Sequence, residues 1–473
     1  MLSFFNKIIS IGNDLLWGKI LIILLITLGL YFTIKSNFVQ FKFFGEMLRL
    51  LGDGANNSSN KNGISSFQAF CISTASRVGT GNLAGVAIAI ALGGPGAVFW
   101  MWLIALIGAS SSFVESTLAQ IYKVKDKDGY RGGPAYYMEK ALNKRWMGII
   151  FSILITICFG LVFNSVQSNT ISLAFNEAFG IDKFTVGIVL TIITAIVIFG
   201  GVKRIAKVAE LIVPIMAVAY ILVALFVIIK NITIIPSIFS LIISSAFGLK
   251  QATGGVIGAL MMGIKRGLFS NEAGMGSAPN AAATAEVTHP VKQGLIQTLG
   301  VFTDTILICS ATAFIILISG VYNTENLSGI QLTQNALSSQ IGSWGNSFIA
   351  LCILLFAFSS IVGNYYYGET NIEFINTNKI WLLIYRISVV SMVYFGSRAE
   401  MPLVWNMADL FMGLMALINL IAISQLSKIA FEALKDYIKQ KKEGKAPVFT
   451  VNSIKGLKNV ECWDEFEKDS MSA

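Results

Sequence analysis

Two short segments of this chain place an arginine, an asparagine and glycines at the same spacing, R-x-x-x-x-N-x-A-G. They are Arg77 to Gly85 (RVGTGNLAG) and Arg266 to Gly274 (RGLFSNEAG). Each lies in an apolar stretch, where glycine permits a helix to break and frees backbone carbonyl and N–H groups. Those groups, with the dipole ends of the two half-helices, can hold a cation and a carboxylate without fixed charges. The alternative interpretation is close packing of helices through small residues.

A second pair of segments shares the pattern F-x-S-[VI]-x-[SG]-N. These segments are Phe163 to Asn169 and Phe358 to Asn364. Both pairs join segments that lie five predicted spans apart, and they occur in the same order, which indicates duplication of a five-span unit. Because five is odd, the second copy enters the membrane from the opposite side. Such inverted repeats are typical of secondary transporters, which hold substrate near the membrane midplane between the repeats.

The elements that must position these motifs are membrane spans. Of the 473 residues, 55% are hydrophobic and 13% are charged, whereas a soluble domain carries about 25% charged residues. The first apolar run has no small-residue cleavage site after it, so we interpret it as a retained span. Apolar stretches of about 20 residues predict eleven spans, centred near residues 27, 80, 110, 160, 193, 220, 262, 307, 355, 389 and 414.

Basic residues follow alternate spans and predict the orientation of the chain. By the positive-inside rule the N-terminus is outside and the C-terminus is cytoplasmic, in a multi-pass protein of the plasma (inner) membrane. The same distribution explains the net charge of +9 without a nucleic-acid partner. Phe38 to Leu51 has near-helical amphipathic spacing and is expected to lie along the cytoplasmic face. The predicted parts are an N-terminal span with this amphipathic segment (1–63), a first five-helix repeat (64–235), a second five-helix repeat (236–426) and a basic cytoplasmic tail (427–473).

Side chains that catalyse reactions or bind transition metals are scarce. His289 is the only histidine, and it precedes a proline in a predicted loop. The cysteines show no C-x-x-C spacing, which favours small buried apolar side chains over disulfides or metal ligands. We therefore predict that the protein is not an enzyme. The cysteines are Cys71, Cys158, Cys309, Cys352 and Cys462.

At these motifs the sequence resembles the alanine or glycine:cation symporter family, sodium-coupled carriers with a LeuT-type fold. The resemblance covers nearly the whole chain. It implies an all-α polytopic membrane protein of about eleven transmembrane helices, a 5+5 inverted repeat with discontinuous helices. It also implies sodium-coupled uptake of a small neutral amino acid of the alanine or glycine class by alternating access. Its most specific stretches are Val78 to Trp102, Arg131 to Leu142, Lys265 to Val287 and Gly363 to Glu369.

The resemblance further implies which residues form the site. Backbone of the first motif would meet the amino acid or the ion, and the second motif would line the opposite side. The implied substrate site comprises Gly79, Thr80, Gly81, Asn82, Gln167, Phe269, Ser270, Asn271, Ser360 and Asn364. By fold analogy, the implied sodium site comprises the carbonyls of Ala75 and Val78 and the hydroxyls of Ser359 and Ser360.

Two residues depart from the pattern of the family's alanine carriers, F-S-T-x-x-G-W-Y-Y-Y-G-E. Ser360 replaces the threonine and Asn364 replaces the tryptophan. Loss of the tryptophan should enlarge the pocket. A carboxamide in its place can hydrogen-bond a polar substrate side chain, and a site built for such a bond discriminates against ligands that lack it. We expect substrates larger than alanine, glutamine being one candidate.

Several charged residues lie within or at the edge of apolar segments, where a charge usually faces the interior with a partner. Glu115 and Asp304 are 189 positions apart, as are Arg77 and Arg266. We expect structural arginine–carboxylate pairing, with a gate or a site where a proton replaces sodium as the alternative. The set comprises Arg77, Glu115, Glu272, Asp304, Glu369 and Asp409.

Other functions are compatible with parts of this pattern. They are a proton-coupled amino-acid carrier, an ion channel of similar topology, a membrane enzyme and a sensor that binds an amino acid without moving it. The sequence shows neither the fourfold repetition nor the acidic ring of a channel filter. The expected partners are a small neutral amino acid, co-transported sodium and membrane lipid, with no nucleic acid and no obligate protein partner.

Overall fold

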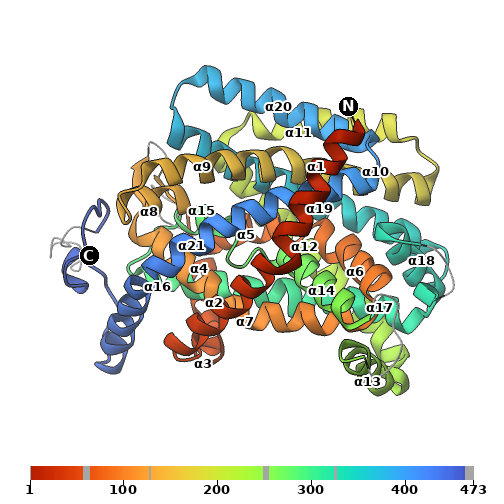
Figure 1. The fold of residues 1–473 in the computed structure, drawn as a ribbon, viewed down its shortest axis with the longest axis horizontal. Coiled ribbons are helices and arrows are strands. Elements are labelled where there is room, and N and C mark those ends of the chain that lie inside the picture. Colours follow the sequence, from red (N-terminus) through yellow and green to blue (C-terminus); the bar gives the residue numbers. More distant parts are fainter. Residues whose placement is uncertain (1, 57–63, 127–128, 249–254, 324–326, 464–473) are drawn as a thin grey trace.

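The structure, a computed structural model, describes residues 2–56, 64–126, 129–248, 255–323 and 327–463. These residues form a bundle of long helices (Figure 1). Among them, eight helices are long and apolar enough to cross a membrane, and a bent pair is a ninth candidate. The eight are Asn6–Lys35, Gly96–Ile121, Arg145–Phe179, Lys207–Lys230, Pro290–Ser319, Trp344–Ile375, Lys379–Arg398 and Met401–Lys442.

The first half of the chain builds the N-terminal helices and one set of bundle helices. Its N-terminal elements are α1 (Leu2–Leu15), the π-helical turn η1 (Leu16–Ile20), α2 (Leu21–Lys35), α3 (Val39–Lys42) and α4 (Phe44–Asn56). The bundle elements are α5 (Ser66–Arg77), η2 (Gly81–Gly85), α6 (Val86–Gly93), α7 (Gly96–Ile121), the hairpin strands β1 (Val124–Asp126) and β2 (Gly129–Arg131), α8 (Pro134–Lys140), α9 (Arg145–Ile155), η3 (Thr156–Phe163), α10 (Asn164–Phe179), α11 (Lys183–Ile198) and α12 (Gly201–Lys230).

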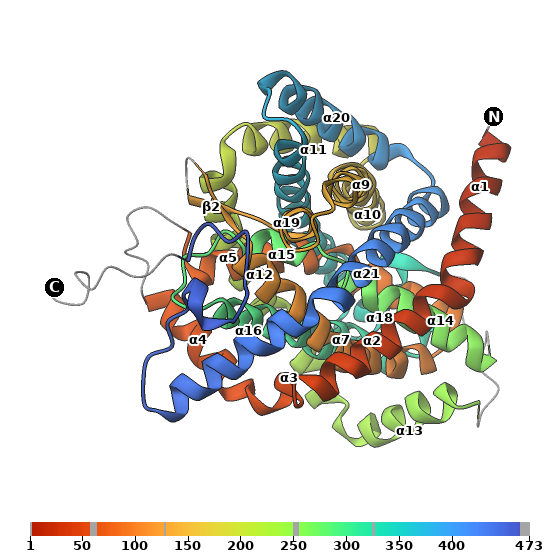
Figure 2. The ribbon, with the colours of Figure 1, turned by 60° about the vertical axis from the view of Figure 1, so that its left-hand side comes forward.

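The second half repeats the order of a broken helix followed by long helices. Its elements are η4 (Ile232–Ile234), α13 (Ile235–Ala246), α14 (Gly255–Asn271), α15 (Ala278–Ala282), α16 (Pro290–Val301), η5 (Phe302–Cys309), α17 (Ser310–Ser319), η6 (Val321–Asn323), α18 (Gly329–Ile341), α19 (Trp344–Ile375), α20 (Lys379–Arg398), α21 (Met401–Lys442) and η7 (Val451–Ser453). The two halves interlock, because α7 packs against α14 and α16, and α10 packs against α19 and α20. Figure 2 shows α10, α11 and α20 on one side of the bundle and α7, α14 and α16 on the other.

Both glycine-rich motifs break their helices, as predicted. α5 ends at Arg77, Val78 has extended backbone (φ −80°, ψ 91°), and the helix resumes at an angle of 48°. α14 continues through Asn271. The backbone then enters the left-handed region at Glu272 (φ 58°), Gly274 (φ 83°) and Gly276 (φ 87°) before α15 begins. A non-glycine residue in that region is costly, so the surrounding contacts must hold Glu272 there.

Two of the eleven predicted spans match helices that are short for a membrane. The span predicted near residue 193 is α11, with 16 residues, and the span near residue 262 is α14, with 17 residues. A helix needs about 20 residues to cross the hydrocarbon core of a bilayer. Both helices therefore exist where predicted, and the total of eleven spans stays a prediction.

The N-terminal elements run along the outside of the bundle beside α21 (Figures 1 and 2). The helices α3 and α4 confirm the helical character predicted for the amphipathic segment. Glu46 of α4 accepts hydrogen bonds from Tyr437 (2.6 Å) and Lys441 (2.8 Å) of α21 and pairs with Arg49. Burial by itself raises the pKa of Glu46, but the hydrogen bonds from Arg49, Lys441 and Tyr437 outweigh it and lower that pKa to about 2. The stabilisation that the ionised Glu46 carboxylate provides through these contacts is therefore present at neutral pH and is lost as the pH falls towards 2.

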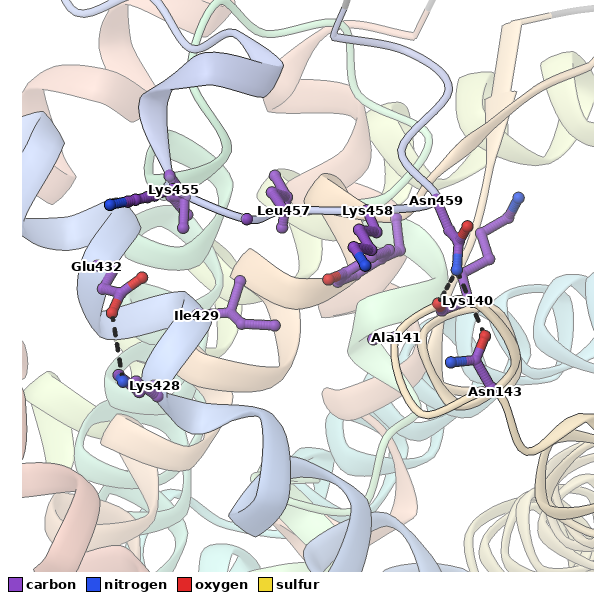
Figure 3. Close-up of a pocket in the computed structure, with 13 residues that line it drawn as sticks. Lys140, Ala141, Asn143, Lys428, Ile429, Glu432, Lys455, Leu457, Lys458 and Asn459 are labelled. Atoms are coloured by element: carbon purple, nitrogen blue, oxygen red, sulfur yellow. Dashed lines mark hydrogen bonds and ion pairs between the residues drawn. The ribbon is translucent and has the colours of Figure 1, made fainter.

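The chain beyond α21 packs back onto the body of the protein. The Trp463 indole N–H donates to the Gln120 carbonyl at 3.0 Å, and Trp463 is buried. Figure 3 shows Asn459 donating to the Lys140 carbonyl at the end of α8, beside a pocket that the tail shares with α8 and α21. The last helix, α21, extends into the predicted basic tail as far as Lys442. No sequence pattern indicated that the tail beyond it would pack in this way.

Close helix contacts depend on small residues, and Gly396 of α20 offers a test. A Cβ at Gly396 would collide with the backbone of Ser165 on α10. We expect Gly396→Ala to lower the free energy of unfolding by about 1–3 kcal/mol, the usual cost of overpacking. The measurement is thermal or denaturant unfolding of the purified protein in detergent. Gly45→Ala in α4 is the control, because a Cβ there meets nothing within 4 Å, and equal destabilisation by both variants would contradict the packing argument.

Candidate functional site

The first helix break is held by side chains that bind its exposed backbone. Gly79 N–H donates to its neighbour Asn82 Oδ1 at 2.9 Å, and Thr80 N–H donates to Gln167 Oε1 of α10, also at 2.9 Å. Thr80 and Asn82 are fully buried, and Gln167 is 2% exposed. Unwound backbone in a membrane must be satisfied by protein groups, and these two amides meet that need.

The glycines of this break permit close approach by neighbouring helices. A Cβ at Gly79 would collide with the Ser360 hydroxyl and would lie 2.9 Å from Gln167 Oε1. A Cβ at Gly81 would lie 2.9 Å from a ring carbon of Phe269 and 3.2 Å from the Cα of Ser270. Residue types other than glycine would push these helices apart, so the two glycines fix how closely α10, α14 and α19 surround the break.

Aromatic rings of η3, α14 and α21 pack around Phe269 beside the first break. The Phe269 ring lies 4.5 Å from that of Phe163 and 4.7 Å from that of Trp405. Phe163 in turn packs on Phe159, with ring centroids 4.6 Å apart. Together these rings give the centre of the bundle an apolar wall opposite the polar backbone of the first break.

Asp304 connects the two motifs through buried hydrogen bonds. Its Oδ1 accepts from Asn82 Nδ2 at 2.6 Å, and its Oδ2 accepts from Ser270 Oγ at 2.6 Å and Thr305 Oγ1 at 2.8 Å. Asp304 is 1% exposed. The carboxylate therefore holds the break in the first half to the helix end in the second half.

Glu115 of α7 holds the second break in the same manner. Its two oxygens accept the N–H groups of Gly274 and Gly276, both at 3.1 Å, and the Glu115 side chain is fully buried. Asn419 of α21 supports it by donating to Glu115 at 2.7 Å and to the Gly274 carbonyl at 2.9 Å. Charge-assisted hydrogen bonds to backbone N–H groups are strong in a dry interior.

Asn364 lies in a polar chain beside the break. Its Oδ1 accepts from Ser76 Oγ at 2.7 Å, and its Nδ2 donates to Asn164 Oδ1 at 3.2 Å. Glu272 joins the chain by accepting from Ser76 at 2.9 Å and from Ser277 at 2.5 Å. The carboxamide predicted to contact substrate is therefore buried and already pairs with a second carboxamide.

One of the two serines of the predicted sodium site lies where it was expected. Ser360 Oγ is 2.9 Å from the Ala75 carbonyl oxygen and 3.4 Å from that of Val78. Ser359 Oγ instead donates to the Phe356 carbonyl of its own helix at 2.9 Å. The set Ala75, Val78 and Ser360 gives three oxygen atoms at the end of α5, a donor type that suits hard cations.

The predicted arginine–carboxylate pairing holds for the second motif but not for the first. Arg266 binds both oxygens of Asp409 at 2.5 Å. Arg77 has no carboxylate within 4 Å among the described residues, and its Nη1 donates to the Gln297 carbonyl at 3.2 Å. The prediction for Arg77 was wrong because Glu115 and Asp304, which lie on the neighbouring helices, are used by the helix breaks.

The structure brings most of the predicted site residues together. Two predicted substrate residues lie apart from the rest. Asn271 accepts the Ala273 N–H on its Oδ1 at 3.0 Å in a turn just past its own helix, and Asn364 lies in the polar chain with Ser76. Sequence reasoning singled out Glu115 and Asp304 as charges but did not place them on the breaks. The available signal was that Glu115 and Asp304 are separated by the same number of positions as the two motif arginines, which places the two carboxylates at matching positions of the repeats. The residues brought together are Gly79, Thr80, Gly81, Asn82, Gln167, Phe269, Ser270 and Ser360.

Comparison with known proteins gives a consistent result. A family model described as the sodium:alanine symporter family matches residues 2–451. The probable sodium/glutamine symporter GlnT of Bacillus subtilis (strain 168) is 62% identical, covering 98% of this chain and 97% of that protein. The amino-acid carrier protein AlsT of the same organism is 59% identical, covering 99% of this chain and 100% of that protein. The crystal structure of MhsT in complex with L-phenylalanine matches with a TM-score of 0.51 at 16% identity, over 80% of this chain and 97% of that one, and this likeness shows the LeuT-type fold alone.

The Arg266–Asp409 pair allows a test of buried charge at the site. Removing one partner of a buried pair leaves an uncompensated charge and costs about 3–5 kcal/mol, whereas removing both is often close to neutral. Asp409 also pairs with the partly exposed Lys265 at 3.4 Å, so Arg266→Gln alone would leave it a partner. We therefore expect Asp409→Asn, which leaves the buried Arg266 without a carboxylate, to reduce the amount of folded protein in the membrane and Arg266→Gln/Asp409→Asn to restore it. Quantitative immunoblotting and size-exclusion chromatography measure this. If the double variant yields less folded protein than the single variant, the pair does not act as a neutral unit.

Proposed function

The chain belongs to the sodium:alanine symporter family, and from that membership we propose that it imports a neutral amino acid with a polar side chain, glutamine above all. It is a membrane transporter and not an enzyme, and sodium is the co-transported ion. The observation that carries the choice of substrate is the buried carboxamide pair of Asn164 and Asn364 beside the first helix break.

The carboxamide pair provides a physical basis for glutamine selectivity. A glutamine side chain offers the same donor and acceptor as either asparagine, so it can replace one partner of the pair without leaving a buried polar group unsatisfied. An alanine side chain offers neither. The smaller side chain of Asn364, which stands where alanine carriers have a tryptophan, would also leave more room for a larger substrate. A relative that is 62% identical bears the name of a probable sodium/glutamine symporter, which agrees with this choice. Alanine or glycine remains the second candidate.

We propose that the zwitterion binds between the two helix breaks. Backbone of Gly79, Thr80 and Gly81, with Asn82 and Gln167, would meet its charged groups, and Phe269 and Ser270 would form the opposite wall. The Thr80 hydroxyl is buried and lacks a hydrogen-bond partner among the described residues. Buried polar atoms nearly always have partners, so this hydroxyl is suited to a polar ligand.

We propose that sodium binds the carbonyls of Ala75 and Val78 together with the Ser360 hydroxyl. These oxygens converge at the last turn of α5 and the extended residue that follows it. Sodium bound there would tie α5 to α19 and order the first break before the amino acid arrives. Ser359 belonged to the predicted set. Both serines donate to the Phe356 carbonyl, but Ser360 also reaches the α5 carbonyls whereas Ser359 contacts the Met216 sulfur, which points to a packing role for Ser359.

The transport cycle follows from two oppositely inserted repeats, residues 64–235 and 236–426, that rock around the filled site. We further propose that the protein lies in the plasma membrane with its N-terminus outside and its C-terminal tail in the cytoplasm. The basic residues that follow alternate helices support this orientation. Sodium flowing down its gradient would then drive inward movement of the amino acid.

The sodium assignment is tested by comparing two neighbouring serines in proteoliposomes. We expect Ser360→Ala to raise the sodium concentration for half-maximal uptake by about tenfold, because it removes one oxygen ligand. Ser359→Ala is the matched control and should change this concentration little. A larger effect of Ser359→Ala than of Ser360→Ala would contradict the assignment, as would glutamine uptake that is unaffected by collapse of the sodium gradient.

Competition experiments test the substrate. A thousandfold excess of unlabelled glutamine should abolish uptake of labelled alanine, and its failure to compete would end the glutamine proposal. Asn364→Ala should raise the KM for glutamine by about tenfold or more, the effect of losing a buried hydrogen bond, and should affect the KM for alanine much less. Asn169→Ala is the control, because Asn169 occupies the matching motif position but binds carbonyls of Gly396 and Ala399.

A further inference from the structure

Arg77 is a buried cation that uses little of its hydrogen-bonding capacity. It ends α5 beside the first helix break and is 2% exposed. Its Nη1 donates to the Gln297 carbonyl, while Nε and Nη2 have no partner among the described residues. A guanidinium stays charged at any physiological pH. Arg77 therefore places a full positive charge in the bundle interior with three N–H donors free.

Three buried carboxylates hold groups at or beside the two helix breaks, and none has a basic partner within 4 Å among the described residues. Glu115, Glu272 and Asp304 are each 1% exposed or less, and the contacts described above are with backbone N–H, amide and hydroxyl groups. Contacts around Arg77 nevertheless lead to all three carboxylates. Ser76, its neighbour in the chain, donates to Glu272 at 2.9 Å. The Gln297 carbonyl that Arg77 binds also accepts from Ser112 Oγ at 3.4 Å, about one helical turn before Glu115, and Asp304 follows Gln297 about two turns later. When ionised, the three carboxylates set three negative charges against one positive charge.

Such an excess of buried negative charge must be balanced in every state that the protein adopts. An isolated ion in a low-dielectric interior costs several kcal/mol or more. In the loaded carrier, sodium supplies positive charge near these carboxylates, whereas the amino-acid zwitterion is neutral overall. In the empty carrier, Arg77 is the cation that the protein itself provides. Its free donors allow it to turn from the Gln297 carbonyl towards a carboxylate.

We propose that Arg77 is the internal counter-cation of the transport site, balancing the buried carboxylates while the carrier returns empty and releasing them when sodium binds. This inference rests on the proposed function, and it makes Arg77 a positioning residue that acts through Glu115, Glu272 and Asp304. Arg77 has no close carboxylate in this structure. Arg266, the matching residue of the second motif, is instead neutralised by Asp409.

The test compares two modes of transport in proteoliposomes that contain Arg77→Gln. Net uptake requires the empty carrier to return, whereas exchange of labelled for unlabelled amino acid with sodium on both sides requires only the loaded carrier. We expect Arg77→Gln to lower net uptake by about tenfold or more relative to exchange, since the empty carrier would carry uncompensated charge. Arg77→Lys should restore a large part of net uptake. The double variant Arg266→Gln/Asp409→Asn is the control, because it removes an arginine without changing the net buried charge.

Direct sodium binding by the purified carrier gives a second readout that does not depend on turnover. Loss of the positive charge should make the carboxylates attract sodium more strongly, lowering the Kd for sodium by about three- to thirtyfold. A purely structural role would instead reduce net uptake and exchange in proportion to protein abundance and would leave the Kd unchanged, and that result would overturn the inference. Failure of the proposed function is distinguishable, because the wild-type carrier would then show no sodium-dependent uptake at all.

Discussion

The structure depends on satisfying the unwound backbone of two broken helices inside an apolar bundle. Hydrocarbon offers no hydrogen bonds to freed N–H and C=O groups, so protein groups must supply them. Two carboxylates do much of this in a crossed arrangement. Glu115, on the helix after the first break, holds the second break, and Asp304, on the helix after the second break, binds Asn82 of the first. Glu115 thus binds the backbone of the second break directly, whereas the N–H groups of the first break are bound within its own half by Asn82 and Gln167, and Asp304 acts through Asn82.

The crossed carboxylates explain why the centre of the bundle is unusually polar for a membrane protein. The chain Asn164–Asn364–Ser76–Glu272 and the cluster around Asp304 lie on either side of the first break. Apolar side chains such as Ile215, Leu222 and Ile229 of α12 are exposed on the outside of the bundle, where lipid can cover them. The polar interior suits the zwitterion and the cation that we propose to bind there, and the apolar exterior keeps the protein within the membrane.

Function arises where the two repeats stop being equivalent. Asn169 and Asn364 occupy matching motif positions, yet the first binds carbonyls of α20 and its end while the second lies in the polar chain beside the break. Arg266 is neutralised by Asp409, whereas Arg77 is not neutralised by any close carboxylate. Duplication supplies a frame with two breaks. In the function proposed above, divergence of single residues assigns one break chiefly to ion and substrate and leaves the other mainly structural.

The sequence by itself determined the membrane class, the helix breaks and most of the site. The length of an apolar segment determines whether it can span a bilayer, and the positions of the glycines determine where its helix breaks. Only the tertiary structure decided which polar groups meet. It placed Glu115 on Gly274 and Gly276, directed Ser360 but not Ser359 at the α5 carbonyls, and left Arg77 unpaired. The physical reason is that hydrogen-bond partners and ion pairs depend on distances of a few ångströms between helices far apart in the chain, and residue spacing along one helix carries no information about them.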